Sequence, residues 1–269
     1  MSARTLAAAA LVILMSAAAR ADESATVSTP KIRAKKASAA AAAPASSYDA
    51  EPTPDTEVID APTSAVLDDH GYSTRSRFFS SGGLQEYLAF GVYPGLNLGA
   101  STAADGLVGS GKTTRVRAPS VQVKYRFYQG SQTLPSLAIG YDGQGYEYNA
   151  LSQRYNQRQR GVYLVGSQEL GMPGLQIHPS FNISDFNSNA IFGSIPVTLN
   201  IRNKAELLAE WDNIADWSHS RLNAGVRAWV NPYFHVEFAV RAIGAGGQYS
   251  DGASRGPERI VELKYTNSF

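Results

Sequence analysis

The sequence predicts an all-β protein: a transmembrane antiparallel β-barrel of about twelve strands with a disordered N-terminal tail. Three observations predict this fold. The chain begins with a pattern typical of export signals. From residue 71 onward, segments of about ten residues alternate apolar with polar side chains, as tilted membrane strands do. The last residue is aromatic and shares a strand face with other apolar side chains.

Residues 1–21 have the three parts of a secretory signal peptide. Arg4 gives a positive start, residues 6–19 are apolar apart from Ser16, and Ala19-Arg20-Ala21 fits an A-x-A cleavage site. The apolar stretch is too short and too rich in alanine for a membrane anchor. We therefore expect export, cleavage after Ala21 and an outer-membrane location.

Composition excludes several classes of protein. The chain has no cysteine, which excludes a lipoprotein anchor, disulfides, thiolate chemistry and cysteine-ligated metals, and we expect neither a metal nor a cofactor. Without Arg4 and Arg20, the chain has 22 basic and 23 acidic residues, a net charge of −1, which argues against nucleic acid as a partner. No later window is apolar enough for a membrane helix, so any membrane span must consist of closed strands.

Residues 22–70 differ in texture from the rest. They hold an alanine run at 39–43, four prolines between 44 and 62, and hardly an aromatic residue. Such a segment buries too little apolar surface to offset its ordering entropy, so we expect a disordered Ala/Pro-rich periplasmic tail. A basic cluster at residues 31–36 is interpreted as part of this solvated tail; contact with anionic lipid or a polymer is the alternative.

Residues 71–269 are expected to form the barrel. The clearest strand is 121–127, with Val, Val, Tyr and Phe on one face and Gln, Lys and Arg on the other. Similar alternation marks 136–142, 175–183, 221–230 and 234–242; weaker candidates are 73–79, 84–93, 95–104, 161–170, 190–200, 204–213 and 259–269.

A soluble, exported β-sandwich that binds ligands also alternates, and it stays open as an alternative. Three features favour the barrel: the strands are long for soluble sheets, the polar faces carry charges, and aromatic residues cluster near strand ends, where a membrane interface would place them. The final strand adds a further one. Val261, Leu263, Tyr265 and Phe269 share one face, and this resembles the carboxy-terminal signal that the barrel-assembly machinery recognises; Asn267 departs from it.

Charged residues gather on the faces that should line the lumen. We interpret them as a network that is structural or sets selectivity rather than one that catalyses, because an unpaired buried charge is costly. In a barrel of this size the network could close the pore or restrict it to small solutes. The network comprises Lys124, Arg126, Glu206, Glu210, Asp212, Arg221, Arg227, Glu237 and Arg241.

Two motifs suggest enzymes. Residues 106–113 fit the phosphate-binding G-x-x-x-x-G-K-[ST] pattern, but no helix is expected after them, so we interpret them as a loop and expect no nucleotide partner. His178 and Ser180, with Asn182 nearby, resemble the catalytic arrangement of outer-membrane phospholipase A. In that family the pair faces lipid, whereas alternation here places both side chains in the lumen, and the family's Ser-Asn-Gly continuation is missing. A lipid-modifying enzyme is therefore the alternative to a non-enzymatic barrel.

The segments 134–141, 161–167 and 207–212 resemble those of the YjbH-type outer-membrane barrels, over roughly residues 84–269. That family is associated with exopolysaccharide production, and this chain would be a short member. The resemblance implies an outer-membrane barrel with a role accessory to polymer export, with outer-membrane lipid and polysaccharide-export components as partners. It implies no active site. The resulting hypothesis is a barrel with an envelope-structural, narrow transport or exopolysaccharide-export role.

Overall fold

In the computed structural model, the described residues are 52–109, 114–145, 148–149, 154–155, 161–184, 191–215, 217, 220–248, 252 and 255–269. The expected signal peptide and residues 22–51 of the expected tail lie outside this part of the chain. Residues 51–269 form one compact unit. Among the described residues, no helix is long and apolar enough to cross a membrane.

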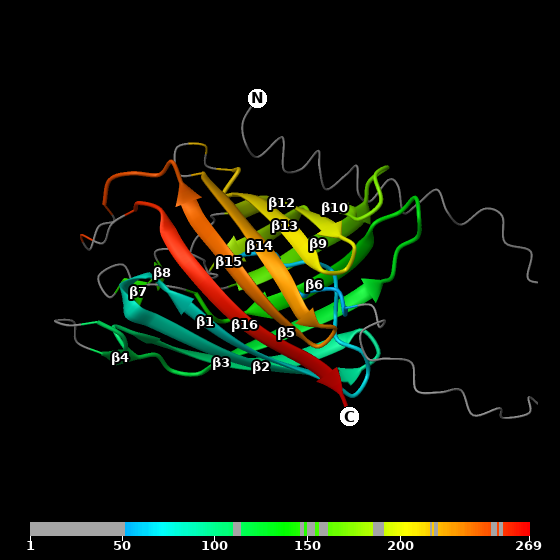
Figure 1. Cartoon of the computed structure of the whole chain (residues 1–269), viewed down its shortest axis with the longest axis horizontal. Coiled ribbons are helices and arrows are strands. Elements are labelled where there is room, and N and C mark those ends of the chain that lie inside the picture. Colours follow the sequence, from blue (N-terminus) through cyan, green and yellow to red (C-terminus); the bar gives the residue numbers. More distant parts are fainter. Residues whose placement is uncertain are drawn as a thin grey trace, which may run out of the picture. The chain divides into compact units, whose positions relative to one another are not determined.

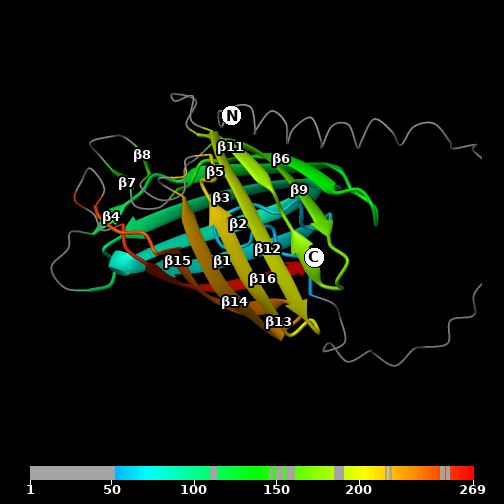
Figure 2. The same cartoon turned by 90° about the horizontal axis from the view of Figure 1, so that it is seen from above.

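One antiparallel sheet closes on itself to form the expected barrel (Figure 1, Figure 2). Twelve strand positions make the ring, as the sequence predicted. In order they are β1 (Gly71–Phe79), β2 (Gly83–Tyr93), β3 (Leu96–Asp105), β5 (Ser120–Tyr128), β6 (Ser136–Asp142), β9 (Gly161–Glu169), β10 with β11 (Leu175–Ile177, Ser180–Ser184), β12 (Ile191–Ile201), β13 (Ala205–Asp212), β14 (Arg221–Asn231), β15 (Phe234–Ile243) and β16 (Glu258–Ser268). The β1–β16 pairing closes the ring. A closed sheet has no edges, which excludes the soluble β-sandwich.

The β10 and β11 segments occupy one position in the ring. Gln176 pairs with Glu169 and Ser180 with Val165, so the register along β9 is unchanged across the break. Pro179 lacks an N–H group and interrupts the ladder at this point. Outside the ring, β4 (Arg115–Val116) pairs with β3, and β7 (Tyr148–Asn149) pairs with β8 (Arg154–Tyr155). A 3-10 turn, η1 (Ser80–Gly82), joins β1 to β2.

Side chains alternate around the wall as predicted. On β15, Phe238 is 55% exposed, while Glu237 beside it is fully buried. On β5, Val121, Val123, Tyr125 and Phe127 face outward, and Gln122 and Lys124 are buried on the other face. An apolar exterior around a charged interior is the arrangement of a membrane barrel and the reverse of a soluble one.

The two ends of the barrel differ. At one end the strands are joined by short turns, such as Pro94–Gly95 and Pro232–Tyr233, and β1 begins and β16 ends there. At the other end the connections are longer, as between Asp142 and Gly161 or between Ile243 and Glu258. We name these the short-turn end and the long-loop end.

Residues 52–70, which we name the inner segment, correct the sequence analysis. They were expected to belong to a disordered tail, yet they lie inside the ring of strands, where both views show them in blue. Val58, Ile59, Val66 and Leu67 are buried. The composition of residues 52–70 does not reveal that they are ordered, because the apolar surface and the counter-charges that order them belong to the barrel wall.

Candidate functional site in the barrel lumen

The inner segment folds into a hairpin that enters and leaves at the short-turn end. Glu57 bridges to Pro62, the N–H of Thr63 donates to the carbonyl of Thr56 at 3.1 Å, and the N–H of Val58 donates to that of Ala61 at 3.0 Å. The tip, Val58–Ala61, lies deep in the lumen. Its return is fixed where the N–H of Leu67 donates to Asn97 Oδ1 at 3.1 Å, close to the start of β3.

The wall offers the tip an apolar seat. Val58 and Ile59 pack with Leu208, Ala239 and Ile260 in one buried cluster. These wall residues belong to a single cross-strand row, because Leu208 pairs with Gly225, Gly225 with Ala239, and Ala239 with Ile260. The row is uncharged within a wall that is otherwise polar, so burying Val58 and Ile59 there removes apolar surface from water on both sides.

Arginines on three strands are held by directly opposed glutamates. Arg77 Nε donates to Glu262 at 2.6 Å and Arg241 Nε to Glu258 at 2.5 Å, each across a neighbouring strand pair. Arg227 contacts Glu237 at 2.7 Å. These cross-strand pairs fix the guanidinium groups. Each of them also has N–H groups that donate to the inner segment.

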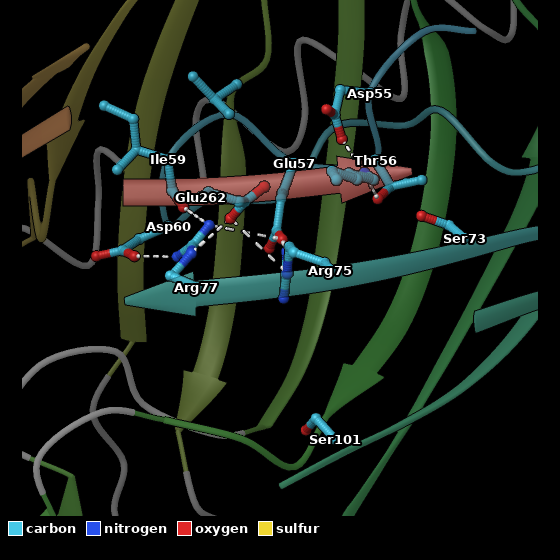
Figure 3. Close-up of polar contacts among 12 residues, drawn as sticks. Asp55, Thr56, Glu57, Ile59, Asp60, Ser73, Arg75, Arg77, Ser101 and Glu262 are labelled. Atoms are coloured by element: carbon cyan, nitrogen blue, oxygen red, sulfur yellow. Dashed lines mark hydrogen bonds and ion pairs between the residues drawn. The ribbon is translucent and has the colours of Figure 1, made fainter. Parts of the chain in front are cut away.

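Other N–H groups of these arginines hold the tip. Asp60 pairs with Arg77 at 3.1 Å and with Arg241 at 3.1 Å, so one carboxylate bridges β1 and β15. Arg77 Nη2 also donates to the carbonyl of Ile59 at 2.7 Å (Figure 3). Arg227 Nη2 donates to the carbonyls of Glu57 and Val58 at 3.1 and 2.9 Å.

Glu210 binds the tip in the opposite sense, as a wall carboxylate that accepts from the segment's backbone. Its Oε2 accepts from the N–H groups of Ile59, Asp60 and Ala61 at 3.3, 3.0 and 2.8 Å. Its Oε1 accepts from Asn223 at 2.7 Å. Successive backbone N–H groups in a turn form a concave site for an acceptor, and here a carboxyl oxygen of the wall occupies it.

The short-turn half of the hairpin is held by cations. Asp55 pairs with Lys264, and lies 3.3 Å from His235 and 3.4 Å from Arg227. Glu57 pairs with Arg75, which also lies over the ring of Tyr87. Burial raises the pKa of Asp55, but Arg227, Lys264 and His235 outweigh it, so this pKa lies well below its ordinary value.

Lys124 holds the hairpin from the opposite wall. Its Nζ donates to the carbonyls of Thr56, Thr63 and Ala65 at 2.5, 3.1 and 3.3 Å. Ser64 is fixed on the same side, where its Oγ lies 2.5 Å from Ser136 Oγ and its N–H donates to Ser167 at 2.9 Å. The segment is therefore bound on both sides of the lumen.

The open volume inside the lumen is much larger at the short-turn end than beside the inner segment. At the short-turn end, a polar vestibule of ≈ 1260 Å³ is lined by residues such as Arg126, Gln129, Asn200 and Trp229. Deeper in, two cavities that described residues form between the inner segment and the wall measure ≈ 30 and 50 Å³, and a third, of ≈ 10 Å³, lies beside the Pro232–Tyr233 turn. A cavity of about 10–15 Å³ is the least that holds one water molecule, so these three cavities hold little more than water.

The residues predicted for the lumen network all lie on the inner face, in separate groups. Glu206 and Glu237 meet at Arg227, and Asp212 lies 3.4 Å from Arg221 near Glu210. Arg241 joins the tip, Lys124 contacts the hairpin backbone, and Arg126 lines the vestibule. The inner segment narrows the lumen, and charged residues of the wall hold it in place.

Eight charged residues of this site were not predicted from the sequence. The overlooked wall residues are Arg75, Arg77, Glu258, Glu262 and Lys264, and the overlooked residues of the segment are Asp55, Glu57 and Asp60. Two signals in the sequence point to them. Arg75 and Arg77 alternate along a strand whose charge needs a partner, and the acids of the segment flank the apolar pair Val58–Ile59.

The described residues do not form a fitted metal centre. Oxygen atoms of Asp60, Glu210 and Asp212 lie within 4.8 Å of one another. Each carboxylate is already bound, Asp60 by arginines, Glu210 by backbone N–H groups and Asp212 by Arg221 and Asn223. The cluster is thus accounted for as part of the contact with the tip.

The two enzyme motifs gain no support from the geometry. His178 Nδ1 lies 2.8 Å from Ser167 Oγ, and Ser180 Oγ lies 2.6 Å from Ser194 Oγ, so each side chain has another partner in the wall. Both are buried on the lumen side, away from lipid. In the glycine-rich motif, residues 110–113 lie outside the described residues, and the strands β3 and β4 flank it where a phosphate loop needs a helix.

The C-terminal strand lies as predicted. Leu263 and Phe269 are exposed on the outer face, whereas Glu262 and Lys264 are buried in the lumen. Phe269 stacks on Tyr72 of β1 with ring centroids 4.8 Å apart, and its N–H donates to the carbonyl of His70 at 3.1 Å. Recognition of Val261, Leu263, Tyr265 and Phe269 by the assembly machinery stays a prediction.

The fold and the site define a class: a barrel of the outer-membrane type whose lumen holds a segment of its own chain. No protein-family model and no curated protein matches the sequence. The solved KdgM porin is similar over 74% of this chain and 99% of its own, with a TM-score of 0.49 and 10% identity. For the NanC porin the shares are 74% and 99%, the TM-score 0.44 and the identity 12%. Omp33 of Acinetobacter baumannii is similar over 76% of this chain and 99% of its own, with a TM-score of 0.35 and 8% identity.

Proposed function

We propose that the protein is a non-enzymatic outer-membrane barrel that passes small polar solutes, and that its own inner segment closes the lumen. One observation carries the proposal: a charged lumen inside an apolar exterior is occupied by a hairpin that polar contacts hold, while a large vestibule lies at one end. A structural barrel needs no such vestibule. The short-turn end is assigned to the periplasm, because outer-membrane barrels have short periplasmic and long extracellular connections.

A reversible lock tests the closure. The native chain has no cysteine, so engineered cysteines are the only thiols present. Ser64 of the hairpin and Ser136 of the wall have their Oγ atoms 2.5 Å apart, within reach of a disulfide. We expect the oxidised S64C/S136C protein to lose the openings that the wild type shows in a planar bilayer, and reduction to restore them.

A matched control keeps the disulfide but spares the hairpin. Ser180 and Ser194 are directly opposed on the wall, with their Oγ atoms 2.6 Å apart. The S180C/S194C protein should conduct like the wild type whether oxidised or reduced. Equal conductance of the oxidised S64C/S136C protein and the wild type would contradict closure by the inner segment. Absence of ion flow from a folded D55N/E57Q/D60N variant would contradict transport itself.

The finer roles follow from this proposal as predictions. A part in exopolysaccharide export, which the YjbH-type resemblance implies, requires the hairpin to leave, because the spaces beside it hold little more than water. Heat-modifiable gel mobility in the outer-membrane fraction is the test of location. A lipid-hydrolysis assay of the purified protein, with S180A as the matched variant, tests the absence of enzymatic activity.

A further inference from the structure

Two buried cations face each other across neighbouring strands of the lumen wall. Arg75 on β1 and Lys264 on β16 are directly opposed partners. Like charges in this position are destabilising, and burial increases the cost of a cation that lacks a counter-charge. Within the wall, Glu262 forms an ion pair with Arg75 at 3.8 Å, which is longer than a hydrogen bond, and it is shared with Arg77, which it contacts at 2.6 Å.

The inner segment supplies one carboxylate to each of these two cations. Asp55 pairs with Lys264. Glu57 pairs with Arg75, and Figure 3 shows both of these side chains. Thr56 between them adds its Oγ1, which lies 3.3 Å from Lys264 Nζ. Two carboxylates, spaced two residues apart on either side of a bend at Thr56, thus meet two cations that lie side by side on the wall.

The wall also binds the backbone of this chain. Lys124 donates to three of its carbonyls and Arg227 to two, so these contacts depend on peptide geometry and not on side-chain identity. Arg227 is held ready by Glu206 and Glu237, at 2.7 Å each. A wall that recognises carbonyls and alternate carboxylates has the features of a peptide site.

We propose that Arg75 and Lys264, with Lys124 and Arg227, form a binding site for an acidic peptide, and that the inner segment occupies it as an internal competitor. This rests on the proposed function and deepens it, because it names the class of solute that enters the lumen when the hairpin leaves. An added acidic peptide then competes directly with Asp55 and Glu57.

Binding is measured without any need for conductance. The full-length protein is folded in detergent, and a fluorescein-labelled short poly-aspartate peptide is titrated by anisotropy. We expect D55N/E57Q, which weakens the competitor, to bind it at least about tenfold more tightly than the wild type, as loss of one charge-assisted contact would allow. Adding R75Q/K264Q to that variant should abolish the gain. R117Q, which removes an arginine paired with Asp105 at the long-loop end, is the matched control and should change nothing.

A second measurement guards against misfolding of the charge variants. Val58 is fully buried, so a single V58C thiol should react slowly with a maleimide. Poly-aspartate should accelerate its labelling by displacing the hairpin, and poly-lysine should not. Equal effects of the two peptides, or tighter binding of an acidic oligosaccharide of matched charge than of poly-aspartate, would overturn the proposal. If the wild type shows no ion flow in the planar bilayer, that result would count against transport. It would leave the peptide site standing.

Discussion

The Glu210 carboxylate on β13 accepts a hydrogen bond from the backbone N–H of Asp60, at 3.0 Å, inside the barrel. The same oxygen accepts from Ile59 and Ala61, so one wall side chain satisfies three donors at the tip of the hairpin. The contact is independent of side-chain identity in the segment, and it fixes the depth to which the hairpin enters.

Removal of this acceptor should loosen the tip. In E210A the three N–H groups lose their partner, and each unsatisfied buried donor costs about 1–3 kcal/mol. E210Q keeps an oxygen acceptor and should have a smaller effect. The measurement is hydrogen exchange at residues 59–61 in detergent, where we expect exchange to be fast in E210A and intermediate in E210Q. Unchanged protection in E210A would contradict this role.

A second prediction concerns Glu262, which holds Arg77 at 2.6 Å and lies near Arg75. E262Q leaves buried arginines with less counter-charge, and breaking a buried pair costs about 3–5 kcal/mol. D105N breaks the more exposed pair with Arg117 and should cost about 1 kcal/mol or less. Urea unfolding in detergent compares the two, and equal effects would show that the lumen pair is not special.

Gly91 provides a steric test of the hairpin's exit. A Cβ atom at this position would lie 2.0 Å from the carbonyl oxygen of Asp68, so alanine forces the backbone of the inner segment away from β2. We expect G91A to lose about 1–3 kcal/mol of stability and to become sensitive to protease near residue 68. At Gly171 an added Cβ meets nothing within 4 Å, so G171A is the control and should behave as the wild type.

The pH dependence follows from Asp55. Its native pKa is held below the unfolded value of about 3.9 by Arg227, Lys264 and His235, against the effect of burial. A lowered pKa stabilises the fold fully above the unfolded pKa, and this stabilisation declines as the pH falls from there toward the native pKa. We expect a carbon-13 titration of the Asp55 carboxyl to show no midpoint above about pH 3. A midpoint near 4 would mean that these cations do not act on it.

The barrel was predictable because period-two alternation is a local property. In residues 121–127, the alternation of apolar and polar side chains is enough to show which face is outside and which lines the lumen. The same holds for the other strands. The inner segment was not predictable in the same way. Its order comes from partners far along the chain, such as Lys264 for Asp55 and Glu210 for the tip, and no local pattern records them.

One signal for the hairpin was present in the wall itself. Gly225 and Ala239 interrupt lumen faces that otherwise carry Arg227, Glu237 and Arg241. An uncharged row would be exposed to water in an open lumen. Here it packs against Val58 and Ile59. Cross-strand register had to be known before those two residues could be recognised as one row.

Pro54 and the start of β1 both lie at the short-turn end, the first beside Pro232 and Tyr233. The hairpin therefore enters and leaves the lumen through the same opening, at the short-turn end. Withdrawal of the hairpin breaks no hydrogen bonds between barrel strands and requires no part of the chain to pass through the ring. A pull on the chain ahead of residue 52 would draw the occupant out while the cylinder stays intact.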